Sequence, residues 1–102
     1  MINRRSKRIA IELSKIIPGG DWVTVPIDRD DDRKLILQHR FEWYTIWEEA
    51  GEDFVRFQVR SSSEHGFDRT QSNKVLNELI DMGWTATILS TGPKSDQYKL
   101  TR

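Results

Sequence analysis

The residues with the most evident chemistry lie between positions 41 and 54. Four aromatic side chains stand within seven positions: Phe41, Trp43, Tyr44 and Trp47. Alternation along a strand would place Tyr44 on the face opposite the other three, so helices on one face could not cover them all. Five carboxylates accompany them, and carboxylates repel a phosphate backbone. We therefore expect protein docking through Glu42, Trp43, Tyr44, Trp47, Glu48, Glu49, Glu52 and Asp53.

A partner of this acidic, aromatic hairpin would most simply be a basic protein surface. The chain would then act as a non-enzymatic regulator, as an inhibitor or an adaptor, and such a face could also occupy the nucleic-acid-binding site of another protein. The competing interpretation is structural, because a small sheet wrapped by two helices can bury nearly all of these aromatics.

A second cluster is basic and begins at the N-terminus. Cations in the first turn of a helix meet the positive end of its dipole, which is unfavourable. Their presence indicates a solvated tail over residues 1–6 or a site for an anionic partner. The alternative function is therefore a nucleic-acid-binding regulator. Its contacts would come from the N-terminus, the second helix and the closing hairpin: Arg4, Arg5, Lys7, Arg8, Arg69, Asn73, Lys74 and Lys94.

Two resemblances bear on this alternative. Ser72–Trp84 and the two strands after it resemble the recognition helix and wing of winged-helix DNA-binding domains over about 30 residues. That family has a further helix upstream, where this chain has the strand pattern Phe54–Arg60. The order of elements over residues 3–82 is similar to that of double-stranded-RNA-binding domains. Those domains carry a basic cluster at the start of their second helix, where this chain has only Arg69 and Lys74.

Catalytic and metal motifs are weak. The Asp28–Arg33 run has no mid-loop glycine and contains two arginines, so a solvated turn is favoured over a divalent-ion loop. Ser61–His65 places hydroxyls, an acid and an imidazole in one loop, but adjacent residues rarely converge as a triad. The chain has no cysteine, which excludes thiolate chemistry and disulfides. We expect no enzyme activity, no cofactor and no metal.

Composition sets the remaining limits. The 102 residues suit one domain, and 16 basic side chains balance 16 acidic ones. A net charge of zero makes phosphate binding less expected. It does not exclude phosphate binding, because the charge is unevenly distributed along the chain. The longest apolar runs are far too short to span a membrane, and no signal peptide is evident, so we expect a cytoplasmic protein. A homodimer is possible if a second copy covers the sheet.

Periodicity predicts the elements that must position these residues. Helical spacing indicates helices over residues 3–17 and 70–82, and the buried face of the second would be Val75, Leu76, Leu79 and Ile80. Alternation indicates strands over 21–28, 33–48, 54–60, 85–89 and 97–101. For 33–48 a strand is favoured over a helix, because a helix there would have no polar face. Alternation places Leu35 and Leu37 on one face with Trp43, and it turns Val55, Phe57 and Val59 inward and Arg56, Gln58 and Arg60 outward.

Pro26 makes the first strand an edge strand. The sixteen-residue strand is too long for one regular element, which predicts a bulge or break near His39. The predicted class is α+β, a small antiparallel sheet in the order α-β-β-β-α-β-β with both helices on one face.

Overall fold

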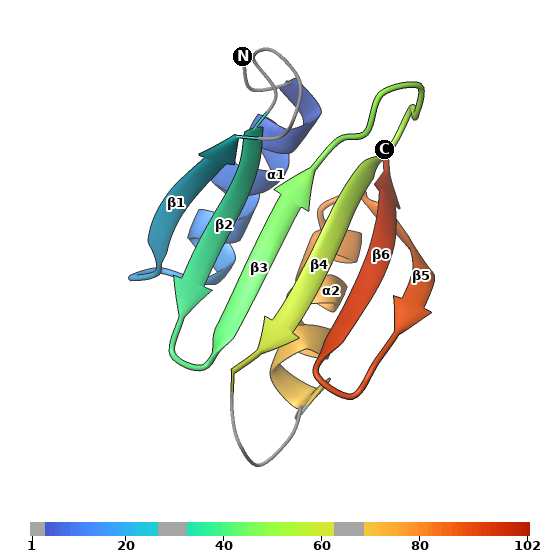
Figure 1. Cartoon of the computed structure of the whole chain (residues 1–102). Helices are drawn as coiled ribbons and strands as arrows, with labels where there is room; N and C mark the ends of the chain where they lie inside the picture. Colours follow the sequence, from blue (N-terminus) through green and yellow to red (C-terminus); the bar gives the residue numbers. More distant parts are fainter. Residues whose placement is uncertain (1–3, 27–32, 63–68) are drawn as a thin grey trace.

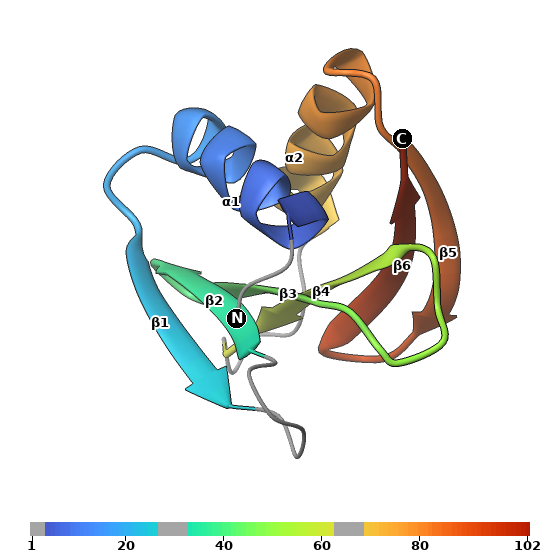
Figure 2. The same ribbon diagram turned by 90° about the horizontal axis from the view of Figure 1, so that it is seen from above.

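Six antiparallel strands form one open sheet, and two helices lie together on one of its faces (Figures 1 and 2). The computed structural model describes residues 4–26, 33–62 and 69–102. The predicted α+β class, with both helices on one side, is confirmed. The elements are α1 (Arg4–Ile16), β1 (Asp21–Pro26), β2 (Arg33–His39), β3 (Glu42–Trp47), β4 (Val55–Ser61), α2 (Arg69–Asp81), β5 (Thr85–Thr91) and β6 (Ser95–Thr101).

The strands follow the spatial order β1-β2-β3-β4-β6-β5. β1 lies at one edge and ends at Pro26, as the missing ladder donor of a proline predicts. The indole of Trp22 donates to Ser14 Oγ at 2.8 Å, which ties this edge to α1. α2 leads from β4 to β5 at the opposite edge, and β6 then returns between them (Figure 1).

The segment predicted as one long strand is two strands. The chain reverses at Arg40 and Phe41, and His39 pairs with Glu42 across the turn. Arg40 has φ 56°, a left-handed conformation that is uncommon outside glycine and that a two-residue hairpin requires. A break near His39 was predicted, but the reversal of the chain into two paired strands was not. Four strands, rather than three, separate the helices.

The reversal changes which side chains share a face. Leu35 and Leu37 were predicted to lie with Trp43, but register places Leu37 opposite Tyr44 and Leu35 opposite Ile46. All four of these apolar residues are buried beneath the helices. Trp43 therefore points to the other side of the sheet.

The core lies between the helices and this inner face. α1 contributes Ile9 and Leu13, and α2 contributes Val75, Leu76 and Leu79, all buried. The inward prediction for Val55, Phe57 and Val59 of β4 is correct, since all three are fully buried. The prediction that Ile80 is buried is wrong, because Ile80 lies about 100° beyond Leu79 on the helix and is 46% exposed.

The structure departs from both resemblances. β4 comes directly before the described start of α2, where a winged-helix domain has another helix. Four strands precede α2, where a double-stranded-RNA-binding domain has three.

Arg4–Ser6, predicted as part of a basic tail, form the first turn of α1. Of the two described helices, neither is long and apolar enough to cross a membrane.

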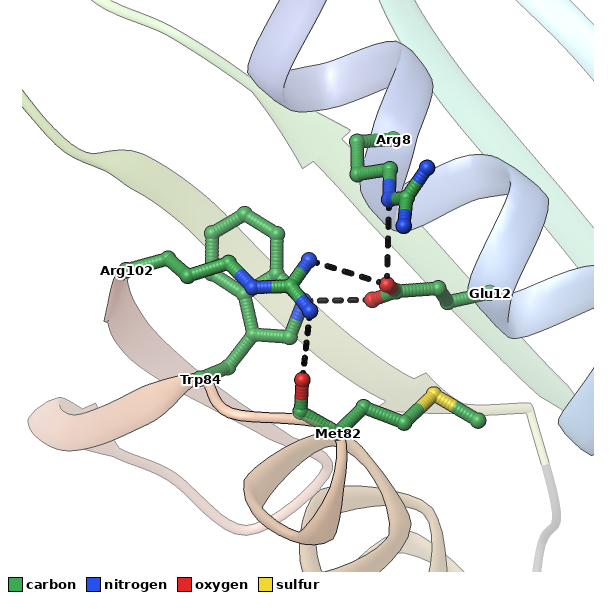
Figure 3. Close-up of polar contacts among 5 residues, drawn as sticks. All are labelled: Arg8, Glu12, Met82, Trp84 and Arg102. Carbon is green, nitrogen blue, oxygen red and sulfur yellow. Dashed lines mark hydrogen bonds and ion pairs between the residues drawn. The ribbon is translucent and has the colours of Figure 1, made fainter.

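A buried carboxylate joins the two ends of the chain (Figure 3). Glu12 of α1 accepts hydrogen bonds from the Trp84 indole, from Arg102 Nη1 at 3.0 Å and from Arg8 Nε at 3.3 Å. The Arg102 guanidinium also lies over the Trp84 ring, 5.1 Å from its centre, and donates to the Met82 carbonyl. This cluster fixes α1 to the end of α2 and to the terminal residues beyond β6.

We predict that Glu12→Gln destabilises the protein. The amide loses the charge that faces two arginines and turns a donor toward groups that already donate, so the free energy of unfolding should fall by about 2–4 kcal/mol. Urea denaturation followed by circular dichroism measures the change. Glu78→Gln, on the exposed side of α2, is the matched control and should change stability by less than about 0.5 kcal/mol. Equal stability of Glu12→Gln and the wild type would show that the cluster does not hold the helices to the sheet.

Candidate functional site

The face of the sheet away from the helices has no element covering it in the described chain (Figure 2). Strand alternation and register place a set of polar, basic and aromatic side chains there. We call this set the open face. Its central members are Lys34, Ile36 and Gln38 of β2, Trp43, Thr45 and Trp47 of β3, Arg56, Gln58 and Arg60 of β4, and Gln97 and Lys99 of β6.

Cations and aromatic rings are paired across this face. The Arg60 guanidinium lies 5.3 Å from the centre of the Trp43 ring, and Lys34 Nζ lies 4.5 Å from that of Trp47. Lys99 Nζ is 4.8 Å from the ring of Phe54, which comes just before β4. Such cation–π contacts hold the charged groups close to the aromatic surface. The result is a basic layer lying directly on a hydrophobic one.

Charge on the open face is strongly positive although the chain is neutral. Among its described strand residues the single carboxylate is Asp21, at the outer edge on β1. Glu52, from the loop before β4, forms a two-bond ion pair with Arg56 at 2.7 and 2.9 Å, and this contact raises the pKa of Arg56. In the described chain no carboxylate forms an ion pair with Lys34 or Arg60. These two cations are therefore available to an anionic ligand.

A hollow of about 380 Å³ opens in this face near β1. Its side chains form two adjacent cross-strand rows, because the register sets Gln38, Trp43 and Arg60 beside one another. The neighbouring row adds apolar Val23 and Ile36 and polar Thr45 and Gln58. The hollow thus combines an aromatic ring, two amides, a hydroxyl and one cation with two apolar side chains.

The predicted acidic, aromatic hairpin does not form one surface. Glu42 begins β3 beside the turn with β2, whereas Glu48, Glu49 and Asp53 lie beyond the opposite end of β3. A six-residue strand separates the two groups by about 20 Å. The structure therefore does not bring the eight predicted docking residues together.

The acidic side chains of that hairpin make contacts within the chain. Arg5 Nη2 forms an ion pair with Glu48 at 2.8 Å, and Arg5 also donates to the main-chain carbonyl of Asp53. Ser6 donates to Glu48 at 2.9 Å, and the Trp47 indole donates to Glu49 at 2.8 Å. These contacts join the start of α1 to the loop before β4. Among the predicted carboxylates, Glu48 thereby gains a cationic partner and Glu49 gains an indole donor.

The predicted aromatic contacts differ in accessibility. Tyr44 is fully buried in the core, stacked on Phe57 with ring centres 6.1 Å apart, and its hydroxyl donates to Glu42 at 2.6 Å. Trp47 is 4% exposed beneath Lys34. Trp43 is half-buried on the open face. Among the three aromatic residues predicted for docking, all of them described, Trp43 is the one that is not buried.

The basic residues of the alternative prediction are dispersed. Arg5 lies near the loop that precedes β4, and Lys94 lies in the β5–β6 turn, where its carbonyl accepts from Ser61 at the other end of β4. Arg8 bonds Glu12, as described above. Lys7 is exposed on α1, and α2 exposes Asn73 and Lys74. These groups do not meet in one patch.

Arg69 has a structural partner. Its guanidinium forms a two-bond ion pair with buried Asp96 of β6, at 2.7 and 3.0 Å, and donates to the Gly92 carbonyl at 2.7 Å. The hydrogen bond to Asp96 raises the pKa of Arg69. This side chain thus anchors the beginning of α2 to the sheet.

Sequence reasoning missed the open face as a site. It placed Arg56, Gln58 and Arg60 outward on their strand, but polar alternation of that kind is ordinary for any exposed strand. Lys34 and Gln38 came to the same face only because the chain reverses at Arg40. The site could have been indicated by cationic and aromatic residues that occur together at the outward positions of neighbouring strands. Residues 28–32 of the Asp28–Arg33 run and residues 63–65 of the Ser61–His65 loop lie outside the described residues.

Comparisons with protein-family models, with curated proteins and with solved structures gave no match to this chain. The function must therefore be inferred from the chemistry of the site. The open face can attract anions, stack planar groups on Trp43 and exchange hydrogen bonds through its amides. A ligand that is both anionic and aromatic would be complementary to these three groups of side chains.

We predict that the tyrosines resist ionisation until the protein unfolds. Burial and the hydrogen bond to Glu42 raise the pKa of Tyr44, and burial raises that of Tyr98. A raised folded pKa means that this stability is fully present below the unfolded value of about 10 and is lost as the pH rises above it. Absorbance at 295 nm should therefore follow unfolding monitored by circular dichroism, and Tyr44→Phe should reduce the alkaline loss of stability. Phenolate absorbance that rises before unfolding would contradict the prediction.

Proposed function

We propose that this protein binds single-stranded nucleic acid on its open face, without catalysing a reaction. The observation that supports this proposal is the pairing of cations with aromatic rings across β2, β3 and β4. A nucleic-acid strand carries phosphates and flat bases in alternation, and the open face offers cations and an accessible indole at neighbouring positions. A cytoplasmic location is part of the proposal and rests on the absence of cysteine.

Each contact type has a residue suited to it. Trp43 is half-buried, so its ring is held in place while part of it can stack on a base. Arg60, lying over that ring, is positioned to neutralise the phosphate next to a stacked base. Lys34 and Lys99 extend the positive surface to the flanking strands.

A single strand suits this face better than a duplex. Base faces are buried in a double helix, so an indole on a sheet can stack only on unpaired bases. A duplex groove would need a protruding helix or ribbon, whereas Trp43 and Arg60 lie on a continuous sheet. The open face also disfavours a second copy of itself, because its cations would then oppose one another.

Docking of the acidic hairpin on a protein stays a prediction. Its residues lie at both ends of β3, and several of its carboxylates have arginine or indole partners, which leaves less charge for a basic surface. Exposed Phe41 is its most accessible apolar group. Binding to nucleic acid on the open face neither requires nor uses this residue.

We predict that the protein binds labelled single-stranded oligonucleotides of about 12 nucleotides in a salt-dependent manner. Fluorescence anisotropy at several salt concentrations measures both the affinity and the salt slope. Trp43→Ala should weaken binding by about 5- to 150-fold, as expected for loss of one stacked base. Arg60→Ala should reduce the slope of log K against log salt by about 0.7, since one phosphate contact is lost.

The control makes a larger charge change than Arg60→Ala does, but places it on the helices. Lys7→Glu combined with Lys74→Glu alters two exposed cations of α1 and α2 and should change affinity by less than about threefold. Loss of binding in this variant, with Trp43→Ala unaffected, would move the site to the helices. Absence of binding to every strand would contradict the proposal and leave a protein partner as the hypothesis to test, with Phe41→Ala as the first variant.

A further inference from the structure

The hollow on the open face has the composition of a small-ligand pocket. Its volume of about 380 Å³ lies within the usual range of about 300–1,000 Å³ for such sites. Apolar Val23 and Ile36 contribute to one side, and Trp43 supplies a planar wall. The other four lining residues, Gln38, Thr45, Gln58 and Arg60, are polar, and polar groups in such a pocket orient its ligand.

We infer that the hollow holds one unpaired nucleobase and distinguishes it from other bases through Gln38 and Gln58. This inference rests on the proposed function and adds a specific base pocket to it. Each glutamine amide offers a donor and an acceptor, which match the mixed donors and acceptors on the edge of a base. Gln38 on β2 pairs with Trp43, and Gln58 on β4 pairs with Thr45, so the two glutamines flank β3. Both line the hollow and can face a planar group in it.

The position of Arg60 links the pocket to the strand that carries the base. Its guanidinium lies at the Trp43 end of the hollow, opposite Trp43 in the strand register. A base inserted against the indole would therefore bring its phosphate close to a cation. A peptide backbone would satisfy the amides, but it does not repeat an anion beside each planar group as a nucleic-acid strand does. The observations thus favour a nucleotide within a strand as the occupant.

The test uses strands of equal length and equal phosphate charge. Oligonucleotides of deoxyadenosine, deoxycytidine or deoxythymidine are compared by anisotropy with an abasic strand that lacks every base. We expect the abasic strand to bind at least about tenfold more weakly, and we expect one base to be preferred by about fivefold or more. Equal binding of the abasic and base-bearing strands would overturn the inference.

Variants then assign the preference to the pocket. Gln38→Met combined with Gln58→Met keeps side-chain length but removes both amides, so the preference should shrink to within about twofold while the salt slope stays unchanged. Gln97→Met is the matched control, because Gln97 pairs with Gln58 on the same face but does not line the hollow. An unchanged preference in the double variant would also overturn the inference. Circular dichroism and thermal unfolding verify that each variant is folded.

The two proposals fail in different ways. If no strand binds, the proposed function itself is wrong. If all base-bearing strands bind with a salt slope that Arg60→Ala reduces, but base identity has no effect, then only the base-specific pocket is wrong, and the open face binds strands through phosphate contacts and stacking on Trp43 without base preference.

Discussion

Coverage of only one face of the sheet is the constraint on which this structure depends. Two helices of 13 residues each lie over one side of six strands, and together with the inner face they bury a continuous core. The other side must therefore be compatible with water or with a ligand. On this side, long cationic and amide side chains cover the apolar surface of the strands, with Lys34 over Trp47 as the clearest case.

Ion pairs attach the helices to the sheet at three places. Glu12 joins α1 to Trp84 and Arg102, Arg69 joins the start of α2 to Asp96, and Arg5 joins α1 to the loop before β4. Each of these contacts occupies a charged side chain that could otherwise bind another molecule. The helical layer and the acidic loop consequently lose much of the charge visible in their sequence. Lys34 and Arg60 are not used in this way in the described structure, and the candidate site follows from that difference.

The turn at Arg40 and Phe41 shows why local patterns were insufficient. Alternation correctly identified strand character on both sides of His39, but it carries no information about chain reversal when the turn lacks glycine, asparagine or proline. The reversal shifted Tyr44 into the core and left Trp43 outside. Alternation had already separated these two predicted docking contacts, and strand pairing decided which of them faces the core.

The sequence by itself determined the α+β class, both helices, the edge position of β1 and the inward face of β4. These features depend on residue periodicity and on proline, which act over a few neighbouring positions. Tertiary structure decided the strand number, the partners of the charged residues and the location of the hollow. Those features depend on register between strands and on contacts such as Glu12 with Trp84, which join positions far apart in the chain. One residue of register decides which face a strand side chain occupies, and only the assembled sheet fixes it.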